Sequence, residues 1–141
     1  MADFVARQEE LQELYLSCGY FSSEATDQLL TQLAKSKAIK TIQRICLRKT
    51  ADFSSDVAAQ ALANIVATAP ALSHCDISGQ QGTRRVKVEV EYATAQPGEA
   101  ITEDKMGLVT VKDKETGAVI YSVATMKKSW LSKVEIVHEQ W

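Results

Sequence analysis

The chain has 141 residues, of which 45% are hydrophobic and 24% are charged, and its formal net charge is −2 at pH 7. These values exclude wholesale disorder and are typical of a soluble globular protein, so we expect a single domain over residues 1–141. No apolar run approaches the roughly 18 residues of a transmembrane helix, which excludes a protein that spans the membrane by helices.

The cysteines and the first residues indicate the compartment. Cys18, Cys46 and Cys75 are odd in number and form neither a Cys-x-x-Cys pair nor a cluster with histidine, so they predict no disulfide framework and no metal site. Free thiols are typical of a reducing compartment, and the first ten residues lack the pattern of a signal peptide. We therefore expect a cytoplasmic protein with no metal, no cofactor and no membrane contact.

Amphipathic segments predict that the first half of the chain, about residues 3–69, contains three to four helices. The second and third segments follow each other without a strong break, so they form either two helices or one. The last segment ends before Pro70, and its predicted inward residues are Val57, Ala61, Leu62 and Ile65. The segments cover residues 3–17, Ser23 onward, 35–49 and 56–69.

The segment from Lys35 to Lys49 has six basic residues and no acidic one. On a helix, its basic and apolar residues would occupy opposite sides. The basic side would hold Lys37, Lys40, Arg44 and Arg48, and the apolar side Ile39, Ile42, Ile45 and Cys46. We expect the basic side to bind an acidic protein partner. A solvated face paired with the glutamates of the first helices, or a nucleic-acid phosphate site, remains an alternative.

The second half, about residues 85–139, is predicted to be an antiparallel meander of four strands. Its first strand alternates valine at 86, 88 and 90 with charged residues, which is typical of a half-buried strand. Loops at Pro97-Gly98 and around Gly117 separate the strands that follow. Those strands are expected near residues 106–112, 118–126 and 130–138.

Helices followed by strands, without alternation, predict an α+β fold in which the N-terminal helices pack on one face of the four-stranded meander. This architecture is similar to hotdog and cystatin-like folds. Because those folds host thioesterases, isomerases and non-enzymatic adaptors, the resemblance implies no particular function.

The third predicted strand is apolar on both faces, which favours a homo-oligomer. The alternative is that long side chains such as Lys112 and Lys128 cover it within one chain. The predicted oligomer interface consists of Ile120, Ala124, Met126 and Trp130.

No residue pattern predicts catalysis. His74 is a poor base for a nucleophilic Cys75, because adjacent side chains of an extended segment point apart. The loop Gly79–Gly82, followed by Arg84 and Arg85, is more typical of a connection than of a phosphate site, because it leads into a strand and not into a helix.

The sequence therefore favours a non-enzymatic interaction or assembly protein that oligomerises through its sheet and presents the basic residues to an acidic partner. A second hypothesis is a small-ligand enzyme or binding protein with an apolar pocket between helices and sheet, where Tyr92, Tyr121 or His138 would supply polar groups. A third hypothesis is nucleic-acid binding through the basic segment.

Overall fold

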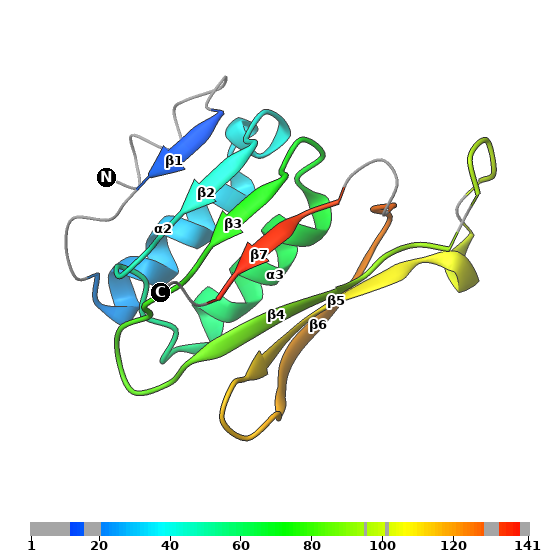
Figure 1. The fold of residues 1–141 in the computed structure, drawn as a ribbon. Helices are drawn as coiled ribbons and strands as arrows, with labels where there is room; N and C mark the ends of the chain where they lie inside the picture. Colours follow the sequence, from blue (N-terminus) through cyan, green and yellow to red (C-terminus); the bar gives the residue numbers. More distant parts are fainter. Residues whose placement is uncertain (1–11, 16–20, 95, 101, 129–132, 139–141) are drawn as a thin grey trace.

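A computed structural model describes residues 12–15, 21–94, 96–100, 102–128 and 133–138 of the chain (Figure 1). Its elements form two sheets and a layer of helices. In chain order they are β1 (Glu13–Tyr15), α2 (Ser23–Lys35), the 3-10 helix η1 (Lys37–Lys40), β2 (Arg44–Cys46), α3 (Asp56–Thr68), β3 (His74–Asp76), β4 (Val86–Glu91), the 3-10 helix η2 (Glu103–Lys105), β5 (Gly107–Asp113), β6 (Val119–Thr125) and β7 (Glu135–Val137).

The first sheet is parallel and has the strand order β1-β2-β3-β7. Helix α2 connects β1 to β2 and α3 connects β2 to β3, and both helices lie on the same face of the sheet (Figure 1). Connections between parallel strands are right-handed, so strands added in one direction place their helices on one face. The central residues of the strands, Leu14, Ile45, Cys75 and Ile136, are in register and point toward this helix layer.

The first three parallel strands belong to a repeat. Glu13 of β1 lies 31 residues before Arg44 of β2, which lies 30 residues before His74 of β3. In the sequence around each strand, apolar residues recur in a pattern of the form L-x-x-L-x-L. The positions are Leu11, Leu14 and Leu16 in the first unit, Ile42, Ile45 and Leu47 in the second, and Leu72, Cys75 and Ile77 in the third.

The second sheet is antiparallel, with the order β4-β5-β6, and it lies in the connection between β3 and β7. It packs through β5 and β6 against α3. At the end of β6, the Thr125 hydroxyl donates to the Ala67 carbonyl at 2.9 Å and the Lys127 ammonium donates to the Ala69 carbonyl. These bonds satisfy carbonyls at the C-terminus of α3, where a cation also suits the helix dipole.

Helix α3 is buried on nearly all sides, because it contacts α2 as well as β5 and β6. A side-chain acceptor, Ser55 Oγ, caps its N-terminus by binding the Val57 amide at 3.2 Å. Small residues allow the neighbouring elements to approach closely. The buried alanines of the helix are Ala58, Ala59, Ala61, Ala63 and Ala67.

The predicted α+β fold is wrong, because the described residues form two α-helices and two sheets, one of them parallel, instead of three to four helices on a four-stranded antiparallel meander. The meander stops at three strands. Its expected fourth strand is β7, which pairs in parallel with β3. A short strand with an apolar face, such as β7, can pair with β6 or with β3. The tertiary structure therefore decides its pairing, and the local sequence pattern does not.

The predicted helix over residues 35–49 is also wrong. Helix α2 ends at Lys35, one turn of 3-10 helix follows, and β2 begins at Arg44. The apolar residues 39, 42 and 45 fit the period of a helix. In the structure, however, Ile42, Ile45 and Leu47 are buried by a short strand and the residues beside it. Of the predicted helix over residues 3–17, residues 13–15 form β1 and 3–11 and 16–17 lie outside the described residues.

Other elements were predicted correctly. Helix α3 and strands β4, β5 and β6 lie within a residue or two of their expected positions. Val57 is an exception within α3, since it is 50% exposed and not inward. None of the described helices has the length and apolarity needed to cross a bilayer.

The tight surroundings of α3 give a first prediction. We expect Ala59→Leu to lower the free energy of unfolding by about 1–3 kcal/mol, because Ala59 is completely buried and added methylenes have no space. Urea denaturation measures this change. Gln60→Leu, on the exposed side of the same helix, is the control and should change stability little. Equal stability of the two variants would contradict the packing described above.

Candidate functional site

The candidate site is the face of the parallel sheet opposite α2 and α3, here called the open face. None of the described helices lies on it (Figure 1). Side chains alternate along a strand, so the residues on either side of each central inward residue point to this face. They are Glu13 and Tyr15 on β1, Arg44 and Cys46 on β2, His74 and Asp76 on β3, and Glu135 and Val137 on β7. Only Asp76 is buried among these eight.

One row of the open face consists of ionisable side chains. Glu13, Arg44, His74 and Glu135 are direct neighbours in the sheet register. Neighbouring strands lie about 4.8 Å apart, so these side chains are within reach of one another. The His74 Nδ1 and Glu135 Oε1 atoms are 3.9 Å apart. An acid, a base, an imidazole and an acid thus follow each other across the sheet.

Two arginines lie on β2 and just after it. Arg44 points to the open face with Cys46. Arg48 lies in the turn that follows, where the Thr50 amide donates to the Leu47 carbonyl at 3.1 Å and Lys49 has a φ of 60°. Arg44 is exposed and Arg48 is half-buried.

The four basic residues predicted to share one helix face are separated. Arg44 lies on the open face, and Arg48 lies in the turn after β2. Lys37 and Lys40 are exposed on η1, which precedes β2, and they do not belong to the strand.

Asp76 anchors the sheet from beneath the exposed residues. Its Oδ1 atom accepts hydrogen bonds from the Ser78 amide at 2.9 Å and from the Ser78 hydroxyl at 2.6 Å. Both residues are buried. Paired in this way, the buried carboxylate holds the turn after β3.

Cys75 is unsuited to nucleophilic chemistry. It is completely buried, and burial, aided by the nearby Asp76 charge, raises the pKa of its thiol to about 12. The thiol therefore stays protonated near neutral pH. His74 points to the opposite face of the sheet, as adjacent strand residues do.

The loop after β3 uses its arginines within the chain. Arg84 donates from Nε to the Phe53 carbonyl at 2.8 Å and from Nη1 to Asp56 at 2.8 Å, while Arg85 donates to the Gly82 carbonyl at 2.6 Å. Gly82 has a φ of 82°, and a Cβ atom there would lie 2.3 Å from Oδ1 of Asp52. These contacts give the loop a structural role between β3 and β4.

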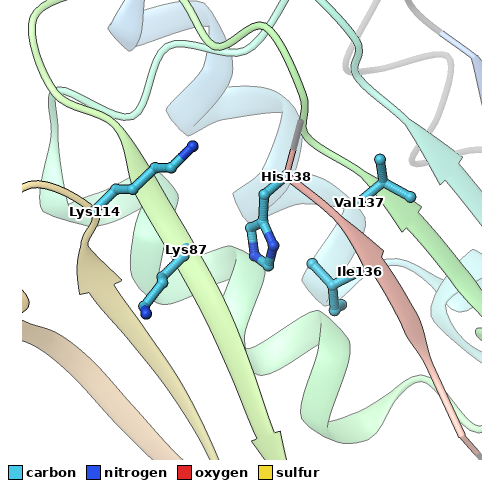
Figure 2. A pocket seen from close by; sticks show the side chains of 5 residues that line it. All are labelled: Lys87, Lys114, Ile136, Val137 and His138. Atoms are coloured by element: carbon cyan, nitrogen blue, oxygen red, sulfur yellow. The ribbon is translucent and has the colours of Figure 1, made fainter. Parts of the chain in front are cut away.

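A hollow of about 380 Å³ lies between β4 and β7. Figure 2 shows His138 pointing toward β4, with Val137 directed away from it. The His138 Nε2 atom accepts a hydrogen bond from the Val88 amide at 2.9 Å. The hollow is lined by Lys87, Lys114, Ile136, Val137 and His138.

The three polar groups predicted to serve a ligand pocket do not converge. Of Tyr92, Tyr121 and His138, only His138 lines the hollow. The Tyr92 hydroxyl accepts from the Val134 amide at 2.9 Å and donates to the Val134 carbonyl at 3.3 Å. Tyr121 is half-buried and packs on the core.

The predicted oligomer interface lies on β6 and just after it. Ala124 and Met126 are exposed and Ile120 is half-buried. Trp130 lies outside the described residues. Among the described residues, no group of three or more histidine, cysteine or acidic side chains has the arrangement of a metal site.

Sequence reasoning missed Glu13, His74 and Glu135 as members of one surface. The L-x-x-L-x-L repeat would have placed the first two beside Arg44, since each stands directly before the central apolar residue of its strand. No family model, curated protein or solved structure matches this chain.

His138 gives a prediction about pH. Burial, together with the Lys114 and Lys87 charges, lowers the pKa of His138 below its ordinary 6.5, although the Val88 hydrogen bond and Glu89 act in the opposite direction. As the pH falls below about 6.5, the unfolded chain therefore binds a proton before the folded chain does. We expect the contribution of His138 to the free energy of unfolding to be constant above this pH. It should decrease as the pH falls from about 6.5 to the pKa of folded His138.

Urea denaturation at a series of pH values measures this effect. His138→Gln removes the titrating group and keeps an acceptor for the Val88 amide, so the variant should lose this part of the pH dependence. His74→Gln retains His138 and serves as the control. An unchanged profile in His138→Gln would show that His138 does not link the two sheets as described.

Proposed function

We propose that this chain is a non-enzymatic interaction module that binds an acidic segment of a protein partner on its open face. The observation that supports this most directly is the row of charged side chains across four parallel strands, on a face without a described helix. Inward positions are apolar and hold the fold, whereas outward positions are largely accessible.

The repeat supports this proposal. Stacked units that each contribute a strand create an extended surface, and repeat proteins commonly bind partners on such surfaces. Because inward residues such as Ile45 supply the packing, outward residues such as Arg44 contribute little to the core. The outward residues are therefore available for recognition.

Arg44 and Arg48 set the chemistry of the partner. Arg44 lies on the open face, and Arg48 follows in the turn at the end of β2. A guanidinium group binds a carboxylate through two parallel hydrogen bonds, so a partner segment with two acidic residues suits these two arginines. Glu13 and Glu135, on the outer strands, favour basic residues of the partner to either side.

Lys37 and Lys40 contribute in a different way. They lie on η1, before β2, and both are exposed. Charges at the rim of an interface mainly raise the association rate. We therefore assign the specific contacts to the two arginines and the long-range attraction to the two lysines.

The mixed charge of the row favours a protein over a nucleic acid. A phosphate backbone carries uniform negative charge, so it would meet Glu13 and Glu135 as well as Arg44. Tyr15 is the only aromatic side chain on the described open face, which leaves little for stacking bases.

A displayed library of short random peptides tests the proposal with defined ligands. We expect selection on the immobilised protein to enrich peptides with at least two acidic residues. With a synthetic peptide of this kind, Arg44→Glu combined with Arg48→Glu should raise the dissociation constant about tenfold or more, because both guanidinium contacts become repulsive. Fluorescence anisotropy measures the constant.

The matched control is Lys37→Glu combined with Lys40→Glu, which changes the net charge by the same amount away from the strand. It should slow association and leave dissociation nearly unchanged. An equal rise of the dissociation constant in both double variants would point to charge alone and contradict a specific open-face site. Binding of a single-stranded RNA with steep salt dependence, without peptide binding, would favour the nucleic-acid alternative.

A further inference from the structure

Strand β6 forms an exposed edge of the antiparallel sheet. It pairs with β5 on one side, and no described strand lies on its other side. No backbone hydrogen bond joins Val119–Thr125 to any described residue beyond this sheet. Its outward N–H and C=O groups are therefore available to another strand.

This edge lacks the features with which proteins protect exposed strands. The segment Ala118–Met126 has no charged residue and no proline, although both commonly block pairing at an edge. A register shift at Val111/Lys112 affects only the beginning of β6. Most of the edge is regular over several consecutive residues.

The side chains beside this edge are apolar and exposed. Leu108 on β5 is 41% exposed, Val119 is 60% exposed and Met126 is 59% exposed. These three are among the five large apolar side chains that are exposed in the described structure. Burial of such residues favours association.

We propose that a second copy of this chain pairs with β6, antiparallel and about a two-fold axis near Ser122. Two three-stranded sheets would then form one sheet of six strands. Antiparallel pairing with a copy is isologous, because each strand offers the same groups to the other. This arrangement closes the edge of both copies.

The sequence of β6 fits pairing with itself. Centred on Ser122, Tyr121 would face Val123 of the partner copy and Ile120 would face its Ala124. Aromatic and β-branched side chains form favourable cross-strand pairs, and a small residue opposite a large one avoids crowding. Strand β6 has no charged residue, so a partner strand with charged residues would find no opposite charge there. The β6 strand of a second copy is equally uncharged.

The dimer is independent of the open-face site. Strand β6 belongs to the antiparallel sheet, and the open face belongs to the parallel sheet. Failure of one proposal leaves the other intact. A dimer would present two open faces, so a partner with two acidic segments would bind more tightly than one with a single segment.

Sedimentation velocity over a wide range of protein concentration tests the dimer. We expect the mass to rise from 15.5 kDa to twice that value with increasing concentration. Ser122→Lys combined with Ala124→Lys places like charges opposite each other at the axis, so the dissociation constant should rise about tenfold or more.

Glu91→Lys is the control, because it changes the net charge by the same amount on the same outer face, on β4 and away from the β6 edge. It should leave dimerisation largely unchanged. Circular dichroism and the thermal midpoint establish that each variant folds. A wild-type protein that stays monomeric, or a β6 variant that dimerises like the wild type, would overturn the proposal.

Hydrogen–deuterium exchange of the unmodified protein provides a second measurement that does not depend on a variant. Amides of Val119–Thr125 that point outward should exchange more slowly at high protein concentration than at low concentration. Amides of β4, at the other side of the sheet, should not change. Dimerisation without slower exchange in β6 would place the interface elsewhere and overturn the proposal.

Discussion

The burial of α3 is the constraint on which the rest of the structure depends. This helix lies under the parallel sheet, between α2 and the antiparallel sheet, so it must be narrow and apolar on several sides. Its buried alanines meet both demands, because small side chains let neighbours approach without leaving voids. The ends of α3 are fixed by Ser55 at its start and by Thr125 and Lys127 near its last carbonyls.

This burial separates the tasks of the two faces of the parallel sheet. The face toward α3 is filled by inward residues, such as Ile45 and Cys75, whose substitution would disturb the core. The open face carries Arg44 and its charged neighbours, which contact the core little. Core residues and exposed residues therefore alternate along the same short strands, and a period of two in the sequence is enough to divide them.

The sequence predicted elements with a long and regular pattern and missed the short ones. The six-residue alternation of β4 and the capped, alanine-rich α3 were identified because several residues supported each of them. Strands β1, β2 and β3 have three residues each, too few to distinguish a strand from one turn of an amphipathic helix. Only comparison of the segments at Leu14, Ile45 and Cys75 with one another reveals the repeat, and therefore the parallel sheet and its open face.

The joint between the two sheets explains why β6, and not β4, is the outer edge of the described antiparallel sheet. Strands β4 and β7 lie side by side but form no ladder. Side chains join them instead, with His138 accepting from the Val88 amide and Tyr92 bonding both backbone groups of Val134. Each sheet thus protects one edge of the other. Because β4 is protected in this way and β5 is central, β6 is the strand of the antiparallel sheet that has no described neighbour on its outer side.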